Sequence, residues 1–212
     1  MKSREKRDLE VQATLAAAFV AFALTFRGPR DRFWQRMTAT GAMLGSLALA
    51  GDPELRRTRI RPSDLGLGAA AAAGLYGIFR IGDRLARRIM PRGARDIDEV
   101  YRLRALCPTP ELVARLGLVI GPAEELFWRG LVQRRLSSRF GRLRGAAAAA
   151  SVYGAAHVVT GNPTLVGAAT TAGAYWSALA AAGLPMGALI VSHVIWDVWI
   201  FLVQPTTGRV ST

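Results

Sequence analysis

The chain has 212 residues, of which 51% are hydrophobic, and its formal net charge is +13. The apolar residues form long runs rather than an alternating pattern, which is typical of membrane helices and not of a soluble domain. So positive a charge would suggest nucleic acid in a soluble protein, but the arginines lie between the apolar runs, where they suit lipid headgroups, and no nucleic-acid-binding motif accompanies them. The single cysteine, Cys107, excludes an internal disulfide and a cysteine-based metal cluster.

Apolar runs follow one another along the chain, and each predicts a helix that crosses the membrane. The first, 11–26, follows a charged tail at 1–10 and lacks the cleavage site of a signal peptide, so we expect it to be retained. The others are 37–51, 65–82, 111–133, 145–160, 164–182 and 186–203. The sequence therefore predicts an all-α, polytopic membrane helix bundle in one integral-membrane domain, 1–212, with about 7 transmembrane helices and a range of about 6–8.

Polar segments join these runs. The longest, 83–110, carries Ile97, Val100 and Tyr101 at helical spacing among charged residues. This pattern predicts an amphipathic helix on the membrane surface, with a solvated linker helix as the alternative. The basic segment 134–144 is expected to be a connector. Asn162-Pro163 and Gly183-Leu184-Pro185 predict tight turns before the last two runs.

Ionisable residues lie inside three of the apolar runs, where a charged side chain costs roughly 2.5–3.5 kcal/mol at the centre of a spanning helix. These residues are Glu124, Glu125, Arg129, His157, His193 and Asp197. Helical spacing puts Glu125 on the same face as Arg129, His193 on that of Asp197, and Tyr153 on that of His157. Scattered toward lipid they would be costly, whereas together they satisfy one another. We therefore expect one polar chamber enclosed by the runs 111–133, 145–160 and 186–203.

Such a chamber suits hydrolysis. A carboxylate with a neutral imidazole can deprotonate a water molecule, and a second imidazole with a polar partner can stabilise the oxyanion that forms on a carbonyl. The set Glu124, His157 and His193 could also ligate zinc. The H-E-x-x-H helix of zinc proteases and the G-x-S-x-G serine elbow are both absent, so no motif here requires a metal or cofactor.

At these residues the sequence resembles the CPBP family, which comprises type II CAAX prenyl endopeptidases, bacteriocin-processing proteins and their bacterial relatives. The family pattern is E-E-x-x-x-R, then aromatic-x-x-x-His, then His-x-x-x-Asn or His-x-x-x-Asp. Here these segments are 124–129, 153–157 and 193–197. The resemblance implies an intramembrane glutamate-type endopeptidase in which Glu124 and His157 activate water. It also implies that His193 and Asp197 hold the oxyanion, while Glu125, Arg129 and Tyr153 support the site.

Two residues depart from the usual family pattern. Tyr153 stands where the family usually has Phe, so its hydroxyl can hydrogen-bond inside the chamber. Asp197 stands where many members have Asn, and an ionised Asp cannot donate to an oxyanion, so it is expected either to orient His193 or to stay protonated.

The leading hypothesis is a hydrolase that cuts a peptide bond near the membrane-embedded or C-terminal anchor segment of a protein. Its partners would be a membrane-anchored protein or peptide substrate and the lipid bilayer, with no nucleic acid. Arginine-rich, alanine-rich composition suggests a bacterium, and hence the inner membrane. The alternatives are a non-proteolytic binding or immunity protein that keeps the fold, and a proton-coupled carrier, although the internal symmetry expected of many carriers is absent.

Overall fold

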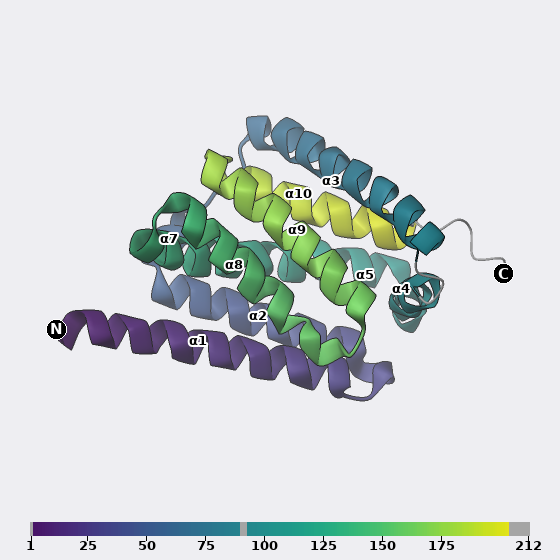
Figure 1. The fold of residues 1–212 in the computed structure, drawn as a ribbon, viewed down its shortest axis with the longest axis horizontal. Helices are drawn as coiled ribbons and strands as arrows, with labels where there is room; N and C mark the ends of the chain where they lie inside the picture. Colours follow the sequence, from purple (N-terminus) through teal and green to yellow (C-terminus); the bar gives the residue numbers. More distant parts are fainter. Residues whose placement is uncertain (1, 90–92, 204–212) are drawn as a thin grey trace.

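The structure is a computed structural model that describes residues 2–89 and 93–203, and this part of the chain is helical and contains no strand (Figure 1). The all-α prediction is confirmed. Most of the long helices run side by side along the long axis of the molecule (Figure 1). They are α1 (Lys2–Arg27), α2 (Phe33–Gly51), α3 (Pro62–Ile89), a composite helix described next, α8 (Arg142–Ala156), α9 (Pro163–Ala182) and α10 (Met186–Val198). The short helix α4 (Gly93–Arg102) lies at one end of the molecule and is seen nearly end-on in Figure 1. The shorter pieces are the 3-10 turns η1 (Arg30–Arg32), η2 (Pro53–Arg57), η3 (Leu103–Leu106) and η6 (Val158–Thr160), and η7 (Trp199–Val203), a π-helical extension of α10.

The composite helix, called the central helix below, runs from residue 109 to residue 140 without a break. Its parts are α5 (Thr109–Arg115), the π-helical η4 (Leu116–Ile120), α6 (Gly121–Glu125), the π-helical η5 (Leu126–Gln133) and α7 (Arg134–Phe140). It packs against α2, α8 and α10, and residues 127–133 are all buried. The part of the chain that carries Glu124, Glu125 and Arg129 is therefore enclosed by neighbouring helices.

Within residues 2–89 and 93–203, three helical segments are long and apolar enough to cross a membrane, namely Leu9–Arg27, Pro62–Arg84 and Met186–Val203. At about 1.5 Å per residue, the 23 residues of the second reach across a hydrocarbon layer of about 30 Å. The remaining helices are short, charged, or rich in small residues, as α9 is. The total of about seven crossings therefore stays a prediction.

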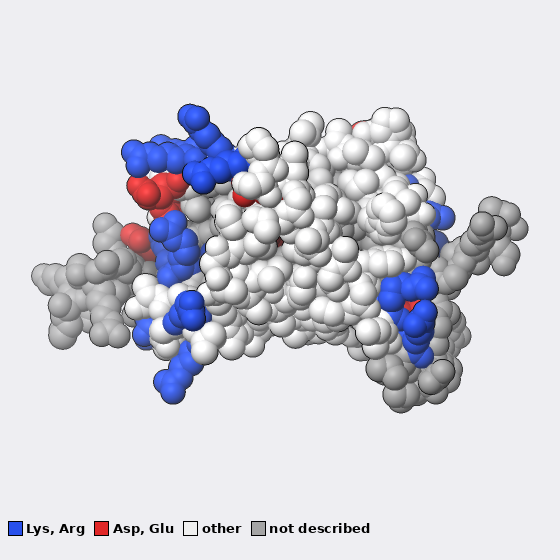
Figure 2. Space-filling model, turned by 90° about the horizontal axis from the view of Figure 1, so that it is seen from above, with Lys and Arg blue, Asp and Glu red and all other residues white. Residues whose placement is uncertain are grey.

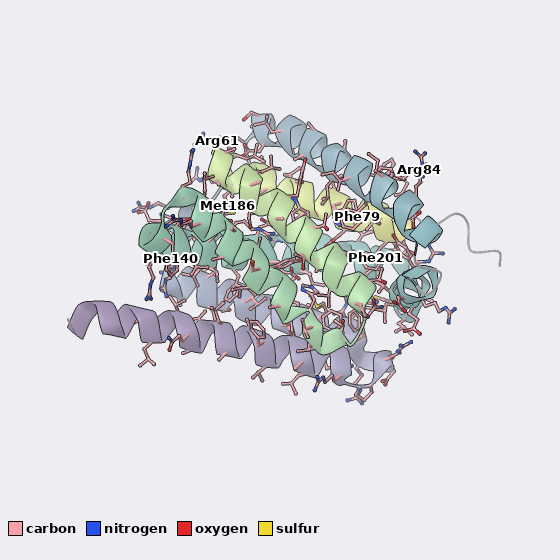
Figure 3. The ribbon with its side chains drawn as sticks, in the orientation of Figure 1. Arg61, Phe79, Arg84, Phe140, Met186 and Phe201 are labelled. Atoms are coloured by element: carbon pink, nitrogen blue, oxygen red, sulfur yellow. The ribbon has the colours of Figure 1, made fainter. Side chains whose placement is uncertain are left out.

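Charged side chains gather at the two ends of the molecule, and the band between them carries almost none in the view of Figure 2. Arg61 lies at one end together with Phe140 and Met186, and Arg84 lies at the other end with Phe201 (Figure 3). Arginines at both ends of an uncharged band match the two headgroup layers of a bilayer. The chain is accordingly an integral membrane protein.

Three helices are longer than the runs that predicted them. The segment 1–10, expected as a tail, belongs to α1 from Lys2 onward. α3 continues to Ile89, and the basic segment 134–144, expected as a connector, is helical as α7 and again from the start of α8. Lys, Arg, Glu and Leu are good helix formers, so these helices continue beyond the apolar region. Only Gly141, with φ of +83°, separates α7 from α8, in a conformation that favours glycine.

The predicted amphipathic helix within 83–110 corresponds to α4, and α3 takes up the start of this segment as far as Ile89. In α4 and the turn after it, Tyr101 is buried and Glu99 is exposed, as an amphipathic helix requires. The side chain of Ile97 lies outside the described part of the chain.

Hydrogen bonds tie α4 to the start of α9. The Asp96 carbonyl oxygen accepts from Asn162 Nδ2, and Asp96 Oδ2 accepts from Thr164 Oγ1, both at 3.0 Å. Asn162 also caps α9 by accepting from the Leu165 N–H at 2.8 Å, and Gly183 ends α9 with φ of +97°. Both predicted turns are confirmed.

Candidate active site

The carboxylates Glu124 and Glu125 lie in α6, between the π-helical turns η4 and η5. Pro122 accounts for the wide turn before them, because proline has no N–H to donate and its ring crowds the carbonyl one turn earlier. There the Gly121 N–H donates to the carbonyl oxygen of Leu116, five residues back. Such π-helical turns are frequent at functional sites, and here two of them flank the acidic pair.

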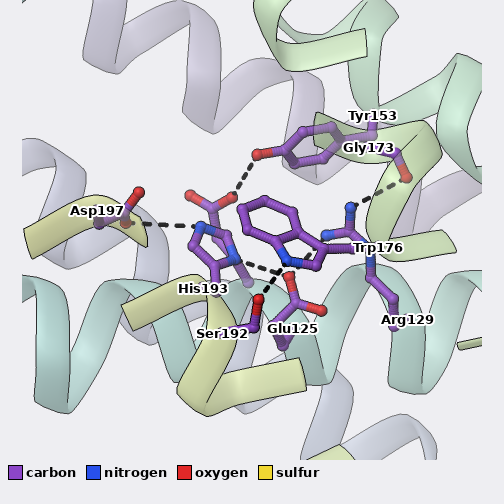
Figure 4. A network of polar contacts seen from close by, with 9 residues as sticks. Glu125, Arg129, Tyr153, Gly173, Trp176, Ser192, His193 and Asp197 are labelled. Carbon is purple, nitrogen blue, oxygen red and sulfur yellow. Dashed lines mark hydrogen bonds and ion pairs between the residues drawn. The ribbon is translucent and has the colours of Figure 1, made fainter. Parts of the chain in front are cut away.

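Glu125 is fully buried and holds two partners with one oxygen, Oε1. Arg129 donates to it from Nη1 at 2.8 Å, so the predicted pair is confirmed, and His193 Nδ1 lies 2.7 Å from the same oxygen (Figure 4). Arg129 also donates from Nη2 to the Gly173 carbonyl oxygen of α9 at 3.3 Å. A buried charge is costly unless it is paired and hydrogen-bonded. Glu125 therefore joins the central helix to α10 and, through Arg129, to α9.

Tyr153 of α8 links Glu124 to His157. Its hydroxyl donates to Glu124 Oε2 at 3.2 Å. The His157 Nδ1 lies 2.9 Å from the backbone oxygen of Tyr153, which can only accept, so a neutral imidazole carries its proton on Nδ1 and its lone pair on Nε2. The His157 ring packs against Phe22 and Phe26 of α1, with centroids 5.2 and 6.0 Å away. His157 is thus held with Nε2 in the form a general base needs.

His193 is held on three sides. Glu125 contacts Nδ1, and Asp197 Oδ2 lies 3.5 Å from Nε2. The Trp176 ring of α9 stacks on the imidazole with centroids 4.2 Å apart and planes 16° apart (Figure 4). Asp197 lies one turn further along α10 than His193. It lies near enough to contact the imidazole, and its orienting role stays a prediction.

A cavity of about 510 Å³ brings the predicted groups together. Glu124, His157, His193 and Asp197 all line it, whereas Glu125 and Arg129 lie behind its wall. Most other lining residues are apolar and come from α1, α2, α3, α4, α9 and η7. The sequence predicted a chamber enclosed by three helices only. This was wrong, because α1, α2, α3, α4 and α9 also line the cavity. The lining includes exposed residues of α3 and α9, among them Ile78 and Thr171, so the cavity opens between these two helices.

The same side chains do not form a metal site. No group of three or more His, Cys, Asp or Glu side chains in residues 2–89 and 93–203 is arranged to hold a metal ion. The set Glu124, His157 and His193, which the sequence offered as possible zinc ligands, is not among such groups. The expectation that the reaction requires no metal stays a prediction.

Sequence reasoning missed three buried polar side chains around the site, those of Gln133, Trp176 and Ser192. Gln133 donates from Nε2 to the Ser177 carbonyl oxygen at 2.9 Å, and Trp176 donates from Nε1 to Ser192 Oγ at 3.0 Å. The spacing of Glu125, Arg129 and Gln133, four residues each, was a usable signal for Gln133. For Trp176, the only hint was a large aromatic residue in a helix otherwise rich in alanine, glycine and threonine.

A family model described as type II CAAX prenyl endopeptidase Rce1-like matches residues 109–199. The match begins at α5 and ends at the start of η7, so it spans the helices that carry every predicted site residue. No curated protein matches the chain, and no solved structure does.

Proposed function

Since residues 109–199 place the chain in the CPBP family of type II CAAX prenyl endopeptidases, we propose that it is an intramembrane glutamate-type endopeptidase. It hydrolyses a peptide bond near the membrane-embedded or C-terminal anchor segment of a protein substrate. One observation carries the proposal: Glu124, His157 and His193 all reach one largely apolar cavity within the helix bundle. We expect the protein in a bacterial inner membrane.

In the proposed reaction, Glu124 and His157 activate the water molecule. Tyr153 occupies Oε2 of Glu124, which leaves the other carboxylate oxygen and the His157 Nε2 to accept the water proton as its oxygen attacks the scissile carbonyl carbon. A positioned general base contributes typically about 10²–10⁴-fold to a rate. The two groups lie on different helices, and Tyr153 fixes their relative position by contacting both.

His193 and Asp197 act on the oxygen of the scissile carbonyl group. His193 donates to the oxyanion that forms when the carbonyl becomes tetrahedral, and Asp197 orients the imidazole. When the intermediate collapses, the C–N bond breaks, the carbonyl re-forms, and the proton held by Glu124 and His157 passes to the leaving amine nitrogen. Loss of one oxyanion donor typically costs about 10²–10³-fold in kcat.

The opening between α3 and α9 suits an apolar segment that arrives from the bilayer. Ile78 and Gly82 of α3 and Gly167 and Thr171 of α9 line this side of the cavity. Gly82 on α3 and the small residues Gly167 and Thr171 on α9 leave room for a polypeptide backbone. A substrate segment entering here reaches Glu124 without crossing the charged ends of the bundle.

A comparison of membrane proteomes tests the proposal without a known substrate. A strain that lacks the gene is complemented with wild-type protein, with Glu124→Gln, or with Glu54→Gln. The last makes the same chemical change at an exposed residue of η2 that pairs with Arg57. We expect wild type and Glu54→Gln to yield shortened forms of at least one anchored protein, whereas Glu124→Gln leaves it intact.

Full cleavage by Glu124→Gln would contradict the proposal. A phenotype that survives substitution of both Glu124 and His157, but is lost on bulky changes to the helix surfaces, would favour a non-proteolytic binding protein instead.

A further inference from the structure

Trp176 is the aromatic residue that lies flat against His193, and no motif of the family pattern includes it. Its side chain is 1% exposed, and its ring plane is within 16° of the imidazole plane at a centroid distance of 4.2 Å. Its Nε1 donates at 3.0 Å to the hydroxyl of Ser192, the residue before His193 on α10. Figure 4 shows the indole between His193 and Arg129.

The stack restricts a tilting of the His193 ring that the carboxylates of Glu125 and Asp197 do not prevent. Glu125 holds Nδ1 at 2.7 Å, but a ring held at one nitrogen can still tilt about that contact. Asp197 Oδ2 is 3.5 Å from Nε2, which is longer than an ordinary hydrogen bond and constrains the tilt weakly. A parallel indole face opposes the tilt, because tilting would give up the aromatic contact or drive the imidazole into the indole.

Trp176 is itself fixed by two of its neighbours. Ser192 sets the rotation of the indole through the hydrogen bond. The guanidinium carbon of Arg129 lies 5.2 Å from the indole centroid, which is a cation–π distance. Arg129 in turn pairs with Glu125, the residue that holds His193. Trp176 therefore contacts both side chains that bind Glu125 Oε1, and it closes a ring of contacts around the acid.

We infer that Trp176 is a positioning residue that sets the plane of His193, and hence the direction in which Nε2 donates to the oxyanion. Ser192 assists by fixing the orientation of the indole through its hydrogen bond. The inference rests on the oxyanion role proposed for His193, and it adds α9 to the helices whose side chains determine the reaction.

Nuclear magnetic resonance tests the stack without a substrate. The chain has two histidines, so selective labelling gives two sets of imidazole signals, which His157→Gln assigns. In detergent micelles, the ring current of Trp176 shifts the His193 ring protons upfield. Trp176→Leu removes that shift, and Trp176→Phe keeps part of it. The signals of His157, whose ring contacts Phe22 and Phe26, stay in place as the internal control for folding.

Kinetics test the functional consequence, with a peptide that spans the cleavage site found by the proteome comparison. Misplacement of a reacting group by about 1 Å can cost about 10²-fold, so we expect Trp176→Leu to lower kcat by about that factor and to change KM by less than about 2-fold. Trp176→Phe restores most of kcat, and Ser192→Ala gives a smaller loss than Trp176→Leu. In a His193→Ala background, Trp176→Leu causes no further loss.

Trp196→Leu is the matched control. Trp196 lines the same cavity and is nearly as buried, but its ring contacts Phe79 and Tyr76. We expect this variant to raise KM and to keep kcat.

Each outcome separates this inference from the proposed function. If Trp176→Leu keeps kcat, or leaves the His193 signals unshifted, Trp176 is no positioning residue, while cleavage by the wild type still supports the protease. If His193→Ala keeps full kcat, the oxyanion role fails and this inference fails with it. Should Trp176→Leu unfold, the His157 signals move as well, and Trp176→Phe and Ser192→Ala decide the question.

Discussion

Replacing Glu125 by alanine tests whether the buried ion pair holds the central helix in place. Glu125 Oε1 contacts two nitrogens, from Arg129 and His193, and all three side chains are at most 5% exposed. Removing one partner of a buried pair costs about 3–5 kcal/mol, because the charge that remains has no compensation. Total stabilities of about 5–15 kcal/mol are usual for folded proteins, so the expected loss is a large fraction of the whole.

Reversible unfolding in mixed detergent micelles measures this loss. Arg129→Met alone should destabilise by a similar amount. Glu125→Leu combined with Arg129→Met should regain most of the stability, because replacing both charges by apolar groups is often neutral. The double variant should still be inactive, since His193 has lost the acceptor at Nδ1. Glu54→Ala, which breaks an exposed pair, should change the free energy of unfolding by less than about 1 kcal/mol. A double variant as unstable as either single one would refute the reasoning.

Three further predictions follow from the site. Tyr153→Phe removes the hydrogen bond to Glu124 but keeps the ring, so kcat should fall by roughly 3–10-fold, for a bond worth about 0.5–1.5 kcal/mol, with little change in melting temperature. Asp197→Asn should keep kcat within about 10-fold of wild type, because the amide can itself donate to the oxyanion, whereas Asp197→Ala removes the group that orients His193 and should lose up to about 10²-fold. Gly173→Ala would bring its methyl group to 2.7 Å from Tyr153 Cδ1 and should destabilise by about 1–3 kcal/mol, as seen in the unfolding midpoint. Gly77→Ala, whose added methyl group meets no atom within 4 Å, should not destabilise the protein.

The helices were predictable where the pattern is local. Apolar runs marked the segments that became α1, α3 and α10, and Asn162 and Gly183 marked turns whose chemistry is set by one or two residues. The helix ends were less predictable. Hydropathy reports where a helix leaves the apolar layer, whereas the end of the helix depends on propensity and on caps such as Gly141. The π-helical turns around Glu124 depend on how the central helix accommodates Pro122 among its neighbours.

The candidate site was likewise predictable in part. The pairing of Glu125 with Arg129 followed from their spacing on one helix, and the convergence of three charged runs followed from the cost of charge in lipid. The contact between Glu125 and His193 joins residues 68 positions apart, and spacing within one helix says nothing about it. Trp176 was unpredictable for a related reason, because its role arises from the packing of α9 against α10.

A single-turnover cleavage in water enriched in the heavy isotope of oxygen tests most directly whether Glu124 and His157 activate water in this cavity. The account predicts that the heavy oxygen appears in the newly formed carboxylate of the product, that the Glu124 side chain stays unlabelled, and that Glu124→Gln gives no labelled product. Heavy oxygen in the Glu124 carboxylate, or labelled product from Glu124→Gln at the wild-type rate, would contradict it.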